Sequence, residues 1–191
     1  LLTGTASVTN DPIAIPAACI SSEDGAALRQ QLALGAMSVR IRMHNRIAPV
    51  TARNVFATLK GTTHPDEIII VGGHLDSWDL ATGATDNGIG SHSILDLARC
   101  LNALGTRPAR TIVFVLFMGE EQGLLGSTAL VEAWKKSGEL GRVKCMINLD
   151  MSGHPSGFNV VGPDNWGALV KGLGDRMHQL DSTFAGGTMS A

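Results

Sequence analysis

The segment EIIIVGG, residues 67–73, carries four consecutive β-branched residues and then stops at two glycines. Two further segments have the same apolar character, TIVFVLFM (111–118) and VKCMINLD (143–150). Continuous apolar runs of this length are typical of strands that are covered on both faces of a parallel or mixed sheet. We therefore expect these three segments to form the buried centre of an α/β protein.

Helical patterns separate the three apolar runs. The segment 91–105 places its apolar side chains on one stripe, which comprises Ile94, Leu95, Ala98, Leu101 and Leu104. Residues 126–138 and 165–180 have a similar pattern. Strands that alternate with helices predict a three-layer α/β/α sandwich with a mixed, largely parallel central sheet.

The segments before the first apolar run give weaker signals. IPAACI (15–20) is typical of a short strand, and a helix capped by Asp24 is expected through residues 25–34, with Gly35 just past its end. SVRIRM (38–43) alternates as a half-buried strand does. TARNVFATLKG (51–61) alternates in the same way, so we expect two further strands here.

The composition excludes several classes of protein. Hydrophobic residues make up 44% of the 191 residues and charged residues 17%, which indicates a folded chain and not a disordered one. A net charge of −2 without any basic run argues against nucleic acid as a partner. No stretch of eighteen uninterrupted apolar residues occurs, so no transmembrane segment is expected. Cys19, Cys100 and Cys145 are widely spaced and are read as free thiols.

Acidic residues and one histidine follow the ends of the three apolar runs. The carboxyl ends of parallel strands meet at one edge of an open α/β sheet, where ligands bind. We therefore expect a cluster at this edge, with a further aspartate on the loop that leads to the helix after Ser91. Its members are His74, Asp76, Asp86, Glu120, Glu121 and Asp150.

A divalent metal is the interpretation that this cluster favours. Taken singly, Glu-Glu after a strand is usually a solvated turn, Asp-Asn-Gly is a common turn, and a lone histidine is usually structural. Together, however, several carboxylates without nearby cations would repel one another and lose solvation. One imidazole with several carboxylates suits Zn²⁺, or less selectively Mn²⁺ or Co²⁺, whereas Ca²⁺ prefers more oxygen ligands.

The motifs that carry the cluster resemble a known family. GGHLDSWD…GATDNGIG, RPARTIVFVLFMGEEQGLLGS and NLDMSG are similar to the co-catalytic di-zinc peptidases, which include bacterial aminopeptidases, glutamate carboxypeptidase and carboxypeptidase Q. The HLDSWD run and the RPART segment resemble the carboxypeptidase Q branch most closely. The resemblance covers residues 68–153 in the order of the family and implies a zinc-exopeptidase fold.

The resemblance also implies a role for each residue of the cluster. His74 and Asp150 would bind one zinc ion and Glu121 the other, with Asp86 bridging the two. Asp76 would hydrogen-bond the far nitrogen of His74 and fix its tautomer. Glu120 would be the general base that activates water, and the Asp86–Asn87 peptide bond would be cis.

The family implies a domain organisation and a setting as well. Residues 1–47 resemble the tail of an inserted protease-associated domain, and residues 48–191 the zinc-peptidase core. The family needs one more histidine on the second zinc, and His154 and His178 lie in the wrong context for it. We therefore expect the sequence to be a fragment that ends before that ligand and is inactive in isolation. A peptide substrate and a secreted or periplasmic location follow from the resemblance, and a homodimer is left open.

The expected activity is hydrolysis of terminal peptide bonds of peptides or dipeptides by water activated by two metals, with a glutamate as general base. One alternative is a single-zinc acyltransferase resembling glutaminyl cyclase. Another is a receptor-like module that kept the fold and lost catalysis. The absence of a G-x-S-x-G motif argues against a serine hydrolase.

Overall fold

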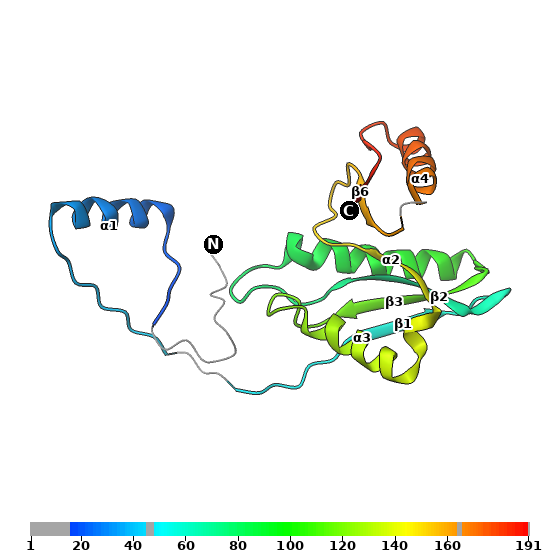
Figure 1. The fold of residues 1–191 in the computed structure, drawn as a ribbon, viewed down its shortest axis with the longest axis horizontal. Helices are drawn as coiled ribbons and strands as arrows, with labels where there is room; N and C mark the ends of the chain where they lie inside the picture. Colours follow the sequence, from blue (N-terminus) through cyan, green and yellow to red (C-terminus); the bar gives the residue numbers. More distant parts are fainter. Residues whose placement is uncertain (1–15, 45–47, 164–165, 191) are drawn as a thin grey trace. The chain divides into compact units, whose positions relative to one another are not determined.

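The computed structural model describes residues 16–44, 48–163 and 166–190 (Figure 1). The chain divides into two units. One comprises residues 53–77 and 82–191, and we call it the sheet unit; the other comprises the residues before Arg53 together with Trp78–Ala81. Every residue of the predicted cluster belongs to the sheet unit.

The centre of the sheet unit is a four-stranded sheet with the strand order β1-β3-β2-β4. Its strands are β1 (Val55–Leu59), β2 (His64–His74), β3 (Arg110–Phe117) and β4 (Val143–Asn148). Strands β2, β3 and β4 are parallel, and β1 pairs with β3 in the antiparallel direction. The predicted mixed, largely parallel sheet is therefore confirmed.

Helices cover both faces of this sheet. Helix α2 (Ile89–Ala103) packs its fully buried Ile94 against Val71, Phe114 and Leu116 on one face. On the other face, Leu130 and Trp134 of α3 (Leu125–Ser137) pack against the core cluster of Ile68, Ile70, Val113, Val115 and Phe117. Alternate residues of β2 and β3 thus point to opposite helices, which produces the predicted three layers.

The remaining elements are smaller. Helix α1 (Ser22–Leu34) belongs to the other unit. An irregular turn (Ala84–Gly88) leads into α2, and a short 3-10 helix (Glu139–Arg142) follows α3. Helix α4 (Gly167–Leu180) lies in sequence between β5 (Phe158–Val161) and β6 (Gly187–Ser190), which form a separate parallel pair. Among the described residues, no helix is long and apolar enough to cross a membrane.

The register of the sheet places the ends of its parallel strands at one edge. His74, the last residue of β2, pairs with Phe117, the last residue of β3. On the other side of β2, Gly72 pairs with Asn148, the last residue of β4. The segments that follow these three strands therefore start within a short distance of one another.

Several local expectations were wrong. Residues 16–20 and 38–43 form no strand, and Ile15 lies outside the described residues. The helix in this region begins earlier than expected, because the Ser21 hydroxyl accepts the Asp24 amide at 2.9 Å and caps it; Asp24 lies inside the helix. A short apolar or alternating segment does not specify a partner strand, and neither segment has one among the described residues.

Two apolar patterns are less buried than their sequences suggest. Two leucines of the predicted stripe are exposed: Leu95 lies on the side of α2 that does not face the sheet, and Leu104 lies just after the helix ends. In β4, Met146 and Ile147 are 45% and 51% exposed. This strand is at the edge of the sheet, so the expectation that all three runs are covered on both faces holds only for β2 and β3.

Candidate metal centre

His74 is held in one orientation at the end of β2. The side chain is 3% exposed, and its Nδ1 lies 3.0 Å from the backbone oxygen of Asp76. The backbone oxygen of His74 accepts the Ser91 hydroxyl at 2.6 Å and the Asn87 amide at 3.3 Å. Both the ring and the backbone of His74 are therefore fixed by hydrogen bonds.

These contacts determine which ring nitrogen carries the hydrogen. A carbonyl oxygen only accepts, so Nδ1 of His74 must be the donor and Nε2 of the neutral ring has a free lone pair. This Nε2 lies 3.0 Å from Oδ1 of Asp86 and 3.5 Å from Oδ1 of Asp150. Despite these distances, Nε2 is buried and has no hydrogen-bond partner among the described residues. A bare lone pair therefore faces two carboxylates.

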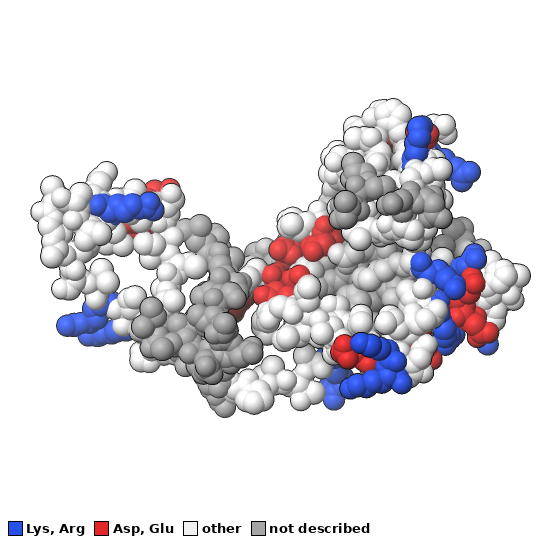
Figure 2. Space-filling view, viewed as in Figure 1, with Lys and Arg blue, Asp and Glu red and all other residues white. Residues whose placement is uncertain are grey.

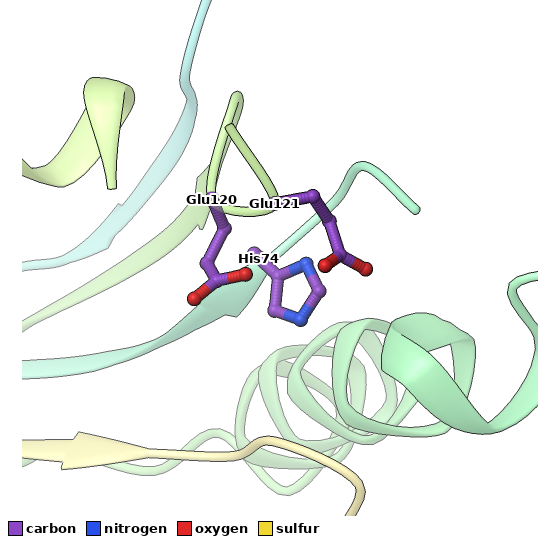
Figure 3. A group of neighbouring side chains, drawn as sticks. All are labelled: His74, Glu120 and Glu121. Carbon is purple, nitrogen blue, oxygen red and sulfur yellow. The ribbon is translucent and has the colours of Figure 1, made fainter. Parts of the chain in front are cut away.

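Glu120 and Glu121 approach the same imidazole from the loop after β3. Figure 3 shows their carboxylates on either side of the His74 ring, both directed toward it. Ligand atoms of His74, Glu120 and Glu121 lie within 4.8 Å of one another, as do those of His74, Asp86 and Asp150. Oε1 of Glu121 is buried without a hydrogen-bond partner. The structure thus brings five of the six predicted side chains into two groups that share His74.

Asp76 has a different contact from the one expected. Its carboxylate accepts the backbone amides of Glu120 at 3.1 Å and Glu121 at 3.2 Å, and it lies 3.7 Å from Nδ1 of His74. Nδ1 of His74 donates its hydrogen bond to the Asp76 backbone oxygen instead. The two amides hold the carboxylate at the base of the glutamate loop, so Asp76 links the end of β2 to this loop.

The negative charge of the site is not balanced by basic side chains. Within the described part of the chain, no lysine or arginine pairs with any of the five carboxylates. Figure 2 shows acidic side chains gathered over this end of the sheet, with no lysine or arginine of the described residues beside them in this view. Such an arrangement favours a bound cation.

The pKa values of the site respond to this charge. Burial lowers the pKa of His74, but the negative charges of Asp150, Glu120 and Asp86 outweigh it, so the pKa lies above its ordinary value. Burial raises the pKa of Glu121, and the charge of Asp86 raises it further, although His74 acts in the opposite direction. Protonation is one way to relieve the repulsion, and binding of a cation is the other.

Asn87 supports the centre and was not recognised from the sequence. The Asn87 side chain is 2% exposed. Its amide nitrogen donates to the backbone oxygen of His74 and to that of Leu149, the latter at 2.9 Å. Its Oδ1 accepts the backbone amide of Met151 at 3.1 Å. The peptide bond between Asp86 and Asn87 is cis. Asn87 thus connects the ends of β2 and β4; the sequence marked it only through the Asp-Asn-Gly turn pattern and the cis bond that the resemblance implied, which is confirmed.

Comparison with known proteins identifies a family and several relatives of this chain. The family model described as peptidase family M28 matches residues 54–185. Carboxypeptidase Q of Mus musculus is 31% identical over 172 residues, which cover 88% of this chain and 36% of that protein. The chain thus spans about a third of the length of this curated relative.

Two solved structures are also similar. A peptidase M28 precursor from Shewanella amazonensis SB2B is 31% identical with a TM-score of 0.64, covering 72% of this chain and 30% of that one. A zinc aminopeptidase from Bacillus subtilis is 30% identical with a TM-score of 0.55, covering 72% and 34%. The family model spans the sheet, both covering helices and all six residues of the predicted cluster. This chain belongs to peptidase family M28.

Proposed function

We propose that this chain carries active-site residues of a zinc-dependent exopeptidase that hydrolyses terminal peptide bonds of peptides or dipeptides. Membership of peptidase family M28 supports the peptidase activity, and the similarity to a zinc aminopeptidase supports the metal. The observation that carries the proposal is the bare Nε2 of His74, which faces the carboxylates of Asp86 and Asp150 without a hydrogen bond.

The donor atoms fit a zinc ion. Ligand atoms about 2.0–2.1 Å from a tetrahedral zinc lie about 3.3 Å from one another. The distances from Nε2 of His74 to Asp86 and Asp150 are 3.0 and 3.5 Å, on either side of that value. Without a cation, a lone pair and two carboxylate oxygens at these distances repel one another. The set of one imidazole and several carboxylates also suits zinc chemically.

The proposed site would hold two zinc ions. His74 and Asp150 would hold one, Glu121 the other, and Asp86 would bridge them. When bound, such a pair of ions supplies Lewis-acid polarisation of the scissile carbonyl and lowers the pKa of water. Asp76 fixes the His74 tautomer through its backbone oxygen, which leaves Nε2 free to act as a ligand.

Glu120 is the proposed general base. Its carboxylate points toward the same centre as that of Glu121, as Figure 3 shows. In the proposed reaction a Glu120 carboxylate oxygen accepts a proton from the attacking water and delivers it to the leaving amine nitrogen. The backbone amide of Glu120 is bonded to Asp76, which restricts where the side chain can reach. Proton transfer of this kind contributes about 10²–10⁴ to the rate.

The experiment compares activity with and without metal in the full-length polypeptide. We expect release of single residues or dipeptide cleavage from a panel of peptides blocked at either end, loss of this activity with a chelator, and recovery with zinc. Cyclisation of N-terminal glutaminyl peptides in place of hydrolysis would favour the acyltransferase alternative. Zinc binding without any turnover would favour the receptor-like module and contradict the proposal.

The remaining assignments are also proposals. We propose that residues 1–47 are the tail of an inserted protease-associated domain; in support, the chain separates near this point, at Arg53. A secreted or periplasmic location stays a prediction from the family resemblance, and so does a homodimer. The panel of blocked peptides described above would distinguish aminopeptidase, carboxypeptidase and dipeptidase activity.

A further inference from the structure

The loop 118–126, which carries both glutamates, is closed at its base by one side chain from outside it. Asn54, immediately before β1, accepts the backbone amide of Met118 through Oδ1 at 3.0 Å. Its Nδ2 donates to the backbone oxygen of Gly126 at 2.9 Å. Met118 is the first residue after β3, and Gly126 is in the first turn of α3. A single amide group therefore joins the two ends of this loop.

The interior of the loop is held by its own backbone. The amides of Gly123 and Leu124 both donate to the Glu120 oxygen at 2.9 Å, and the Leu125 amide donates to the Gly119 oxygen at 2.9 Å. Gly119 has a φ of 76°, in the left-handed region. Because these hydrogen bonds make the loop one compact turn, a shift of its ends would move the two glutamates with it.

Gly126 is needed for the closure of the loop. A Cβ atom at this position would lie 2.3 Å from Oδ1 of Asn54 and 2.3 Å from the backbone oxygen of Met118. Both are far below van der Waals contact, so any larger residue would separate Asn54 from the loop. The close approach at Gly126 and the two hydrogen bonds of Asn54 thus belong to the same arrangement.

We propose that Asn54 is a positioning residue for the glutamate pair. It acts through Met118 and Gly126, and it places the Glu120 and Glu121 carboxylates against His74 without contacting them. The inference rests on the proposed peptidase function for its catalytic consequence. Its structural part, the placement of the glutamates, is independent of any metal.

Strand β3, which the glutamate loop follows, offers a matched control at its other end. The Thr111 hydroxyl, near the start of β3, accepts the Gly61 amide at 3.1 Å and donates to the Pro65 oxygen at 2.7 Å. It therefore joins two backbone segments with one accepted and one donated hydrogen bond, as Asn54 does. Thr111→Val removes both bonds far from the glutamates, so it reports the effect of a lost bridge on folding alone.

The test measures kinetics and amide exchange for Asn54→Ala and Thr111→Val in the full-length polypeptide. We expect Asn54→Ala to lower kcat by about 10–100-fold, because displacements on the order of 1 Å at a reacting group have effects of this size. KM should change by less than about threefold, since a catalytic group is displaced and substrate binding is not. In the metal-free protein, the amides of Met118, Glu120 and Glu121 should exchange faster. Thr111→Val should change neither kcat nor these amides.

A second variant disrupts the same contact by changing the loop instead of Asn54. Gly126→Ala keeps the Asn54 residue, but the added Cβ would clash with its Oδ1 and push the amide away from the loop. This variant should therefore reproduce the fall in kcat and the faster exchange. Unchanged exchange at Glu120 and Glu121 in Asn54→Ala would overturn the positioning role whatever the activity. Equal losses of kcat in Asn54→Ala and Thr111→Val would also overturn it. Faster exchange in a protein whose wild type has no peptidase activity would support the positioning role and contradict the proposed function.

Discussion

Acidic side chains lie at both ends of the central sheet, but the protein neutralises them at only one. At the amino end, Glu67 pairs with Arg110 and Lys144, and Arg142 pairs with Asp66 and Glu139. At the carboxyl end, the described residues supply no basic partner for the five carboxylates around His74. Figure 2 shows this contrast, with mixed charges at one end and acidic groups alone at the other.

The difference indicates what each end requires. Charge pairs at the amino end are largely exposed and contribute little to stability, and they need nothing from solution. At the carboxyl end, the carboxylates repel one another, and protonation or a bound cation would relieve this repulsion. The same fold therefore combines an end whose charges are paired with an end whose charges are relieved by protonation or by a bound cation, and the following predictions test that difference.

The largest effect is expected for Glu120→Gln. This substitution keeps the shape of the side chain and leaves the proposed metal ligands untouched, so zinc content should stay the same. Turnover should fall by about two to four orders of magnitude, because the proposed general base is lost. The measurement is the zinc content and peptide hydrolysis rate of the full-length protein. Glu67→Gln at the amino end is the control and should leave both unchanged; loss of zinc from the Glu120 variant would mean that Glu120 is a ligand.

Asn87→Ala should have the next largest effect, on stability and on metal affinity together. It leaves the backbone groups of His74, Leu149 and Met151 without their buried partner, so the free energy of unfolding should fall by about 2–4 kcal/mol. Urea unfolding of the metal-free protein and a competitive zinc titration are the two measurements. Thr111→Val should cost about 1–3 kcal/mol without weakening zinc. Equal weakening of zinc binding by both variants would contradict the assigned role of Asn87.

The smallest effect concerns Glu67 and pH. Burial raises the pKa of Glu67, but the hydrogen bond and charge of Arg110 together with the charge of Lys144 lower it by more, so the net pKa is below the ordinary value of 4.5. Its contribution to stability is therefore present above pH 4.5 and is lost as the pH falls through the lowered pKa. The difference in Tm between the wild type and Glu67→Gln should shrink across this range. Glu132→Gln, on the exposed face of α3, is the control; a difference that grows on acidification would contradict the prediction.

The sequence predicted the buried elements well because their signals are local. Long apolar runs identified β2 and β3, and periodic helices identified α2 and α3. The strands expected at 15–20 and 38–43 do not form in the described residues 16–20 and 38–43, because a segment of about six residues does not specify whether a partner strand exists. The apolar sequence of β4 could not reveal its place at the sheet edge, since that depends on which segments pair.

The candidate site was predictable in its charged residues but not in its supporting contacts. His74 and most of the acidic residues directly follow the apolar runs in the sequence. Because parallel strands end at one edge of a sheet, their proximity could be predicted. Asn54 and Asn87 act through backbone groups more than sixty positions away, and no local pattern encodes such contacts. Nδ1 of His74 donates to the backbone oxygen of Asp76 and not to its carboxylate, and this choice likewise depends on how the loops meet.

The most direct test of the central claim is the Tm of the wild type and of Glu121→Gln, each measured without metal and with zinc at neutral pH. Oε1 of Glu121 is buried without a hydrogen-bond partner among the described residues, and burial together with the charge of Asp86 raises the pKa of Glu121, so its charge is unfavourable in the metal-free fold. Removal of that charge should raise the Tm without metal, and loss of a ligand should lower the Tm with zinc. A lower Tm of the variant in both states, or no stabilisation of the wild type by zinc, would contradict a cation-dependent end of the sheet.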